Sequence, residues 1–233
     1  MPAKNKSRVN DFVIRIANVN GTGSASANTL LMKSIFRMGI PVTGKNFFPS
    51  NIQGLPTWYE IRVTKDAYLA RSGEVDIMVA MNAQTYQKDL KEVSSGGVLI
   101  YDSSWPRENF KDRSDIEILG IPLARMCNDH FSNARARILM KNISYVGALA
   151  ALLEIDLKII KSLLGETFAS KPNLIESNME AIKLGYDFAT ENFICPLETR
   201  TKKMNKTKDH IMIDGNTAAG LGCVYAGATV AAW

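Results

Sequence analysis

The stretch FVIRIANVNGTGSASANTLL, residues 12–31, contains the first unit of the fold. Its opening run is apolar and partly β-branched, which predicts a buried strand. Two glycines and three hydroxyl side chains follow within six residues, and an apolar pattern with helical spacing then begins. We therefore expect a strand, a glycine turn and a helix in direct succession.

The same alternation of patterns continues along the chain. Further strand-like runs lie at residues 57–63, 75–81, 97–102 and 115–121. From about residue 138 helical periodicity dominates, over residues 138–153, 156–168 and 171–193. Strands that alternate with helices are typical of α/β proteins. The sequence thus predicts an α/β fold, a Rossmann-like open sheet with flanking helices and a helical C-terminal part.

Composition limits the class of protein. The chain has 233 residues, of which 46% are hydrophobic and 22% charged, so it can bury a substantial core. Its apolar stretches are shorter than a membrane span, and its polar start lacks the apolar core of a signal peptide. We expect a soluble cytoplasmic protein with no membrane partner. Cys127, Cys195 and Cys223 lie far apart without CxxC spacing, which predicts neither disulfides nor a metal site.

The formal net charge of +5 is concentrated in one place. Much of the excess lies in TRTKKMNKTK, residues 199–208, which contains no interleaved aromatic residue. We interpret this tract as a solvated linker and expect no nucleic-acid partner. His130 and His210 have no companions at catalytic or metal-binding spacings, so no catalytic residue is expected.

The glycine turn has the composition of an anion-binding site. A helix that opens at Ser24 leaves its first amide groups without backbone partners, and glycines allow a ligand to approach them. Thr22, Ser24 and Ser26 would add hydroxyl donors, which makes phosphate the natural guest at this position after the first strand. Neither the GxGxxG nor the GK[ST] motif is present. A tight turn with a serine cap explains the same residues, and the local sequence leaves both interpretations open.

A second loop presents side-chain amides. GKNFFPSNIQGLPTW, residues 44–58, has no strong periodicity and carries Asn51 and Gln53. If the sheet is parallel, this loop would approach the same edge as the glycine turn, and the two amides would bind a ligand there. The alternative is a turn-rich connection whose amides cap its own backbone.

Several segments in order resemble the gamma domain of 2-oxoacid:ferredoxin oxidoreductases. In this family a GxGGxG turn follows the first strand, and it falls here on NVNGTG, residues 18–23. Gly21 and Gly23 match, whereas Asn18 and Asn20 replace glycines. Asparagine tolerates positive φ better than most residues, so we expect the turn to survive with a more crowded approach for phosphate. FPSNIQG and residues 146–189 also resemble the family's loop and helical tail.

The resemblance is to the form in which gamma is fused ahead of the alpha, or pyrimidine-binding, domain. It implies a gamma domain over residues 1–198, CoA-binding and Rossmann-like, and a basic linker over 199–209. Residues 210–233 would be the truncated start of the alpha domain, without the YPITP-like motif that would follow in the family. We expect residues after about 209 to be poorly anchored, because their apolar face lacks the domain that it should cover.

The resemblance also implies a function. Such enzymes oxidatively decarboxylate a 2-oxoacid, with 2-oxoglutarate favoured for the fused form, and release an acyl-CoA while electrons pass to ferredoxin. Coenzyme A would be the co-substrate of this domain, with thiamine diphosphate, magnesium and the iron–sulfur cluster in other domains or subunits. The expected partners are the remainder of the alpha domain, the beta subunit and ferredoxin. The residues expected to contact CoA are Gly21, Thr22, Gly23, Ser24, Asn51 and Gln53.

Two other functions remain open at this point. The domain would be a purely structural scaffold if its glycine turn binds nothing, or a stand-alone nucleotide-binding regulator if it works without partners. In each case the 233-residue chain alone is expected to be inactive as an oxidoreductase. Its sequence shows no nucleophile and base at the spacing of a known catalytic motif.

Overall fold

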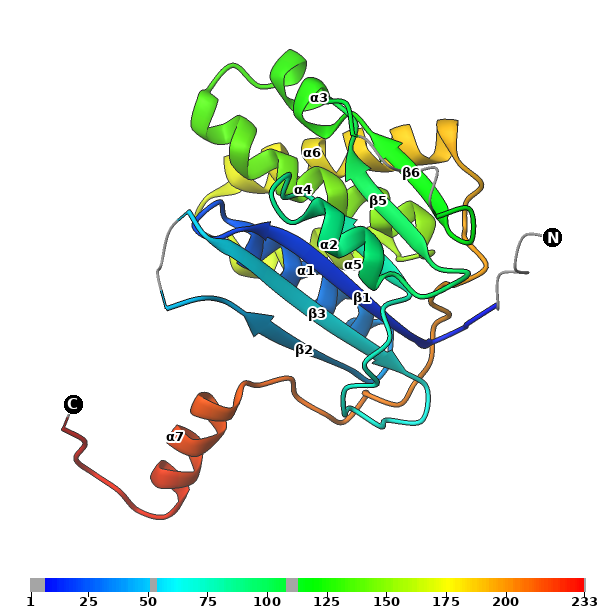
Figure 1. The fold of residues 1–233 in the computed structure, drawn as a ribbon. Helices are drawn as coiled ribbons and strands as arrows, with labels where there is room; N and C mark the ends of the chain where they lie inside the picture. Colours follow the sequence, from blue (N-terminus) through cyan, green and yellow to red (C-terminus); the bar gives the residue numbers. More distant parts are fainter. Residues whose placement is uncertain (1–6, 51–53, 108–112, 233) are drawn as a thin grey trace.

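The computed structural model describes residues 7–50, 54–107 and 113–232 (Figure 1). Strands and helices alternate in its first half, and helices follow one another in its second half. In chain order they are β1 (Asp11–Val19), α1 (Ser24–Arg37), β2 (Val42–Phe47), β3 (Pro56–Thr64), β4 (Ile77–Ala80), α2 (Tyr86–Glu92), β5 (Val98–Asp102), β6 (Glu117–Ile121), α3 (Leu123–His130), α4 (Ala134–Leu152), α5 (Leu157–Thr167), α6 (Pro172–Asn192) and α7 (Gly215–Tyr225).

The strands form one six-stranded sheet in the order β2-β3-β1-β4-β5-β6. β1, β4, β5 and β6 run parallel to one another, whereas β3 runs antiparallel to both β1 and β2. The predicted α/β fold with flanking helices and a helical C-terminal part is confirmed. All the predicted strands form, and the first unit is the expected strand, turn and helix.

The prediction of a loop over residues 44–58 is wrong at both of its ends. Residues 44–47 belong to β2, and residues 56–58 already belong to β3. Within the described part of the chain, β2 pairs with β3 alone, and it has exposed polar side chains, among them Lys45 and Asn46. Strands at the edge of a sheet are often short and polar, so they lack the apolar pattern by which buried strands are found.

Helices cover the two faces of the sheet unequally (Figure 1). Ile14 and Ile16 of β1 belong to the larger core, which they share with α1, α4, α5 and α6. Ala17 of the same strand belongs to a smaller core with α2. Adjacent strand residues point to opposite faces, which explains how one strand serves both cores. The larger core therefore places α1 and α4 on the same side of β1.

Helices α4 and α6 approach each other at two glycines. A Cβ atom at Gly147 of α4 would overlap the carbonyl oxygen of Ile182, and one at Gly185 of α6 would overlap that of Ser144. No side chain fits at either position while the backbones keep this separation. The two glycines therefore allow the short distance between the backbones of α4 and α6.

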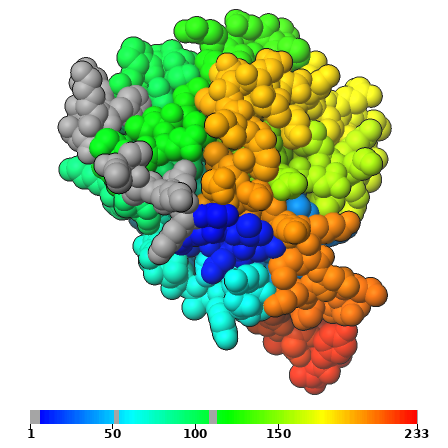
Figure 2. Space-filling model, turned by 90° about the vertical axis from the view of Figure 1, so that its right-hand side faces the viewer, coloured from blue at the N-terminus to red at the C-terminus, as the bar shows by residue number. Residues whose placement is uncertain are grey.

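The basic tract is attached to the body by its backbone. The Asn10 amide donates to the carbonyl oxygen of Arg200 (3.1 Å), and the buried Thr201 hydroxyl donates to that of Leu153 (2.6 Å). The Met204 amide donates to the carbonyl oxygen of Met38 (2.9 Å). Figure 2 shows this part of the chain lying against the N-terminal segment. The lysines of the tract are exposed as expected, but its backbone is not a free linker.

The C-terminal segment projects from the body (Figures 1 and 2). Helix α7 has no buried residue, and its Val224 and Tyr225 are 66% and 89% exposed. This exposure agrees with the expectation that residues after about 209 are poorly anchored to the rest of the chain. Neither α7 nor any other helix in the described ranges is long and apolar enough to cross a membrane.

The close approach of α4 and α6 makes a testable prediction. Gly147→Ala should lower the free energy of unfolding by about 1–3 kcal/mol, because the added methyl group must push the two backbones apart. Gly165→Ala in α5 is the matched control, since a Cβ atom there meets nothing within 4 Å. It should raise the free energy by about 0.5–1 kcal/mol through helix propensity. Urea denaturation measures both, and equal effects of the two substitutions would contradict the close contact.

Candidate functional site

The glycine turn between β1 and α1 depends on its two glycines. Gly21 and Gly23 have φ angles of 86° and 81°, in the left-handed region that favours glycine. Asn18 and Asn20 are not among the described residues with positive φ. The turn survives the two asparagines as expected, and their tolerance of positive φ is not used, because the two glycines that match the family pattern provide the left-handed backbone of the turn.

The first turn of α1 is uncapped. Gly23 occupies the N-cap position, and no described side chain accepts a hydrogen bond from the helix start. No carbonyl oxygen elsewhere in the described ranges accepts from the amides of Ser24, Ala25 or Ser26. The serine cap of the alternative interpretation is therefore wrong, whereas its tight turn between strand and helix is present. Unpaired amides at the positive end of a helix favour a bound anion.

The three hydroxyl groups of the turn differ in availability. The Thr22 hydroxyl donates to the carbonyl oxygen of Val19 (2.8 Å) and lies 3.2 Å from Oδ1 of Asn18. Its proton is therefore engaged inside the turn, where it stabilises the backbone. Ser24 is 6% exposed, whereas Ser26 is exposed to solvent. Of the three expected hydroxyl donors, Ser26 is the one that faces solvent freely.

Two residues of helix α4 contact the glycine turn directly. The side-chain amide of Asn142 donates to the carbonyl oxygen of Thr22 (2.8 Å) and accepts from the amide of Asn18 (3.0 Å). Leu139, one turn earlier, lies so close that a Cβ atom at Gly23 would overlap it. Asn18 and Asn142 are both buried. The shape of the turn is therefore fixed by residues more than a hundred positions away, which local sequence cannot reveal.

Two further polar contacts extend this arrangement. The phenol of Tyr145 on α4 donates to Oδ1 of Asn28 on α1 (2.7 Å). Complete burial raises the pKa of Tyr145, so the phenol keeps the proton that it donates. From the end of β4, the side-chain amide of Asn82 donates to the carbonyl oxygen of Asn18 (3.4 Å). Sequence reasoning missed these buried residues, because no local pattern marks them as partners of the turn.

The second predicted loop does adjoin the glycine turn. Asn51 and Gln53 lie outside the described residues, but the residues after them are in place. The Gly54 amide donates to the carbonyl oxygen of Asn20 (3.1 Å), and the Asn20 amide donates to that of Leu55 (2.9 Å). The assumed parallel pairing is wrong, because β3 is antiparallel to β1 and so begins beside the end of β1. The ligand contacts of Asn51 and Gln53 stay predictions.

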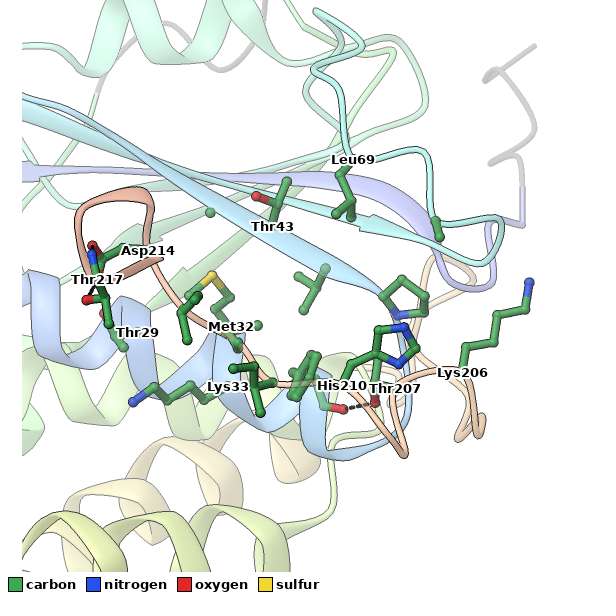
Figure 3. Close-up of a pocket in the computed structure, with 18 of the residues that line it drawn as sticks. Thr29, Met32, Lys33, Thr43, Leu69, Lys206, Thr207, His210, Asp214 and Thr217 are labelled. Carbon is green, nitrogen blue, oxygen red and sulfur yellow. Dashed lines mark hydrogen bonds between the residues drawn. The ribbon is translucent and has the colours of Figure 1, made fainter. Parts of the chain in front are cut away.

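Two hollows flank α1. One, here called the α1–α5 groove, has a volume of about 320 Å³ and is lined by Ala25, Ser26, Leu30, Leu163, Phe168 and Asn178, among others. The other, the α1–β2 hollow, is larger at about 660 Å³. In Figure 3 its walls carry Thr29, Met32 and Lys33 of α1, Thr43 of β2, and side chains of residues 206–217. The α1–β2 hollow includes no residue of the first turn of α1, so its size does not make it the ligand site.

The remaining reactive side chains have structural roles. Asp102 at the end of β5 accepts from the amides of Ser104 (3.1 Å) and Ala124 (3.3 Å), which caps α3. Burial raises the pKa of the Cys127 thiol, which favours its protonated form. Within the described ranges no group of three His, Cys, Asp or Glu residues could hold a metal ion. These residues do not fit an iron–sulfur cluster, and none is assigned to one.

Known proteins identify the family to which this arrangement belongs. The family described as pyruvate ferredoxin/flavodoxin oxidoreductase matches residues 13–188, from β1 into α6. The chain belongs to this family. The matched range contains the glycine turn, Asn142 and the residues that line the α1–α5 groove.

Two relatives extend the match along the chain. The alpha subunit of 2-oxoacid:ferredoxin oxidoreductase 2 of Aeropyrum pernix is 22% identical, over 93% of this chain and 40% of that protein. Subunit KorA of the 2-oxoglutarate oxidoreductase of Mycobacterium tuberculosis is 23% identical, over 97% of this chain and 38% of that protein. The chain thus spans about two fifths of the length of these relatives.

Solved structures share the fold of this pyruvate ferredoxin/flavodoxin oxidoreductase family member. The 2-oxoglutarate:ferredoxin oxidoreductase of Magnetococcus marinus, with 2-oxoglutarate, coenzyme A and succinyl-CoA bound, has a TM-score of 0.82 at 24% identity, over 94% of this chain and 37% of that chain. The gamma subunit of a keto/oxoacid ferredoxin oxidoreductase of Geobacter sulfurreducens has a TM-score of 0.60 at 16% identity, over 77% and 99% of the two chains.

The clamp on the turn can be tested through Asn142. Asn142→Ala should lower the free energy of unfolding by about 1–3 kcal/mol, because it leaves the Thr22 carbonyl oxygen and the Asn18 amide buried without this partner. Amide exchange in the first turn of α1 should also become faster. Asn192→Ala is the control, since that exposed side chain bonds only within α6 among the described residues, and it should change stability by less than about 0.5 kcal/mol. Equal losses in the two variants would contradict the clamp.

Proposed function

We propose that this chain is the CoA-binding and assembly part of a 2-oxoacid:ferredoxin oxidoreductase, which oxidatively decarboxylates a 2-oxoacid to an acyl-CoA. The observation that carries the proposal is the uncapped start of α1, where the amides of Ser24, Ala25 and Ser26 have no acceptor among the described residues. Phosphate groups bind at helix starts of this kind. Family membership and the CoA bound in the Magnetococcus marinus enzyme support CoA as the phosphate carrier.

The 2-oxoacid is proposed to be 2-oxoglutarate. The names of the Mycobacterium tuberculosis relative and of the Magnetococcus marinus structure support this choice. A ketoisovalerate oxidoreductase subunit of Methanothermobacter marburgensis also matches, at 24% identity, but over only 50% of this chain. We prefer 2-oxoglutarate because the relatives named for it match nearly the whole of this chain, whereas the ketoisovalerate relative matches half of it.

The domain organisation is proposed as residues 1–198 for the gamma domain, 199–209 for the connecting tract and 210–233 for the start of an alpha domain. The Geobacter sulfurreducens gamma subunit supports this division, because its whole length corresponds to about three quarters of the chain. The exposed apolar α7 is consistent with a surface that another domain covers. The proposed partners are accordingly the remainder of the alpha domain, the beta subunit and, through the complex, ferredoxin.

Thiamine diphosphate, magnesium and the iron–sulfur cluster are proposed to lie in those other domains or subunits. The 233-residue chain alone should therefore show no oxidation of 2-oxoglutarate with CoA, thiamine diphosphate and ferredoxin. Its described residues contribute only binding and packing to the reaction. Reduction of ferredoxin by the purified chain in a spectroscopic assay would contradict this assignment.

The anion site itself is tested with Ser26→Asp. The new carboxylate would lie in the first turn of α1, where it favours the helix by about 0.3–1 kcal/mol but repels a bound phosphate. The affinity of the chain for CoA, measured by titration calorimetry, should fall at least about tenfold. A substitution at Gly23 is less informative, because any side chain there would strain the positive φ and overlap Leu139.

The matched control is Asn173→Asp in the first turn of α6. Asn173 is exposed, so the variant adds the same charge at another helix start while CoA binding should stay unchanged. No measurable binding of CoA to the unmodified chain would overturn the proposal and favour a structural scaffold. Binding of adenosine diphosphate more tightly than CoA would instead favour a stand-alone nucleotide-binding regulator.

A further inference from the structure

The face of the sheet opposite α1 is open over β2 and β3. Figure 1 shows α1 behind the strands, whereas no helix of the described chain lies in front of β2 and β3. Helix α2 covers only the neighbouring part of this face, where it packs on the smaller core with Ala17 of β1. Beside α2 lies a hollow of about 280 Å³, lined by Arg15, Phe47, Trp58, Arg71, Lys88 and Glu92.

The strands arrange the side chains of this face in two rows. Lys45 of β2, Glu60 of β3 and Arg15 of β1 are direct neighbours in one row. Phe47 of β2 and Trp58 of β3 are neighbours in the next row. Residues directly opposite each other on antiparallel strands point to the same face and interact. The rows thus place a line of charged groups beside a pair of aromatic rings.

The carboxylates of this face are paired from within the sheet. The side chain of Glu60 is only 3% exposed, and it accepts from Nη2 of Arg15 (2.5 Å) and Nε of Arg71 (2.6 Å). Oε2 of Glu92 accepts from Nη1 of Arg15 (2.6 Å). A buried charge is stable only with such partners. The negative charges are therefore neutralised by arginines of the same face.

The most exposed charged groups here are cations that rest on the aromatic rings. The Arg71 guanidinium lies 4.6 Å from the centre of the Phe47 ring, and the Lys88 ammonium lies 4.7 Å from that of Trp58. Their side chains are 46% and 63% exposed. Lys45 is exposed, lies 5.4 Å from the Phe47 ring and forms no ion pair with a described residue. These five residues are here called the cation–aromatic face.

The cation–aromatic face is ordered before any partner binds. The indole N–H of Trp58 donates to Oδ1 of Asp89 in α2 (2.8 Å), which fixes the ring. Cation–π contacts hold Arg71 and Lys88 over their rings. Side chains that are already ordered lose less entropy on association. Tryptophan and arginine are also the residues most often found as anchors in protein interfaces.

The outward charge of this face selects the kind of partner. Its exposed groups are hydrogen-bond donors with positive charge, so they match a surface that carries carboxylates. A second copy of this chain would present the same cations in a symmetric pair, and the two faces would repel each other. The rings lie beneath Arg71 and Lys88, so they do not offer the open surface on which nucleic-acid bases stack.

We propose that the cation–aromatic face docks an acidic segment of a partner protein. Carboxylates of that segment would pair with Lys45, Arg71 and Lys88, and its carbon chains would pack beside the two rings. The face lies on the other side of the sheet from α1, so the partner and a ligand at the start of α1 would not compete. The inference is therefore independent of the proposed CoA function.

Poly-L-glutamate is the acidic probe, titrated into the full chain and followed by nuclear magnetic resonance. The indole N–H resonance of Trp58, assigned by its loss in Trp58→Phe, reports locally because the ring lies under Lys88. It should shift on binding. The double variant Lys45→Gln/Lys88→Gln removes two exposed charges and should weaken the affinity at least about tenfold. Added salt should weaken binding to the unmodified chain.

Lys158→Gln/Lys161→Gln is the matched control. Both lysines are exposed on α5, which packs on the larger core at the other side of the sheet. The control therefore lowers the net charge by the same amount as the test variant. It should change the affinity by less than about twofold, because distant surface charges are screened. Circular dichroism and thermal unfolding verify that both variants keep the fold.

Four results would overturn the proposal. These are equal weakening by the two double variants, a Trp58 resonance that does not move with added poly-L-glutamate, tighter binding of oligothymidylate than of poly-L-glutamate at this resonance, and a shift that follows protein concentration without any probe. The third result would identify a nucleic-acid surface, and the fourth an interface between two copies of this chain.

Discussion

The contact between α4 and the glycine turn is the constraint on which the site depends. Asn142 bonds both sides of the turn, at 2.8 Å to Thr22 and 3.0 Å to Asn18, and Leu139 closes the space above Gly23. A turn with two left-handed glycines has little intrinsic stiffness, because glycine loses more conformational freedom than other residues on folding. The clamp from α4 supplies that stiffness. Free amides at a helix start bind an anion well only when the backbone holds them in place.

The first unit of the fold was predictable because one local pattern contains all of it. A β-branched apolar run, a glycine turn and a 3.6-residue period appear within residues 12–31, and each is a property of short sequence. β2 was not predictable in the same way, because an edge strand buries little and its pairing with β3 is decided by distant residues. The contact between Asn142 and the turn was not predictable for a similar reason. Asn142 reaches the turn only through the packing of α4 in the folded chain.

The approach of the second loop to the turn was predicted correctly from a wrong premise. Parallel strands meet ligands at their carboxyl ends, and a loop before a parallel strand would lie at the opposite end of the sheet. Because β3 is antiparallel, its beginning at Pro56 lies opposite Val19, the last residue of β1. The mixed sheet thus brings two loops to one edge, and the Asn20 backbone joins them through its bonds to Gly54 and Leu55. Direction of pairing is a tertiary property that composition does not encode.

The asparagines show how the turn departs from a glycine-rich pattern without losing its geometry. At position 18 a glycine would remove the hydrogen bond to Oδ1 of Asn142, whereas the side chain of Asn18 makes that bond and also accepts from the Val19 amide (2.8 Å). The side chain therefore points into the α1–α4 contact and away from the uncapped amides. It adds order to the turn and leaves the amides at the start of α1 uncapped. An anion site of this kind depends on oriented backbone dipoles, so its strength follows from rigidity rather than from a nearby cation.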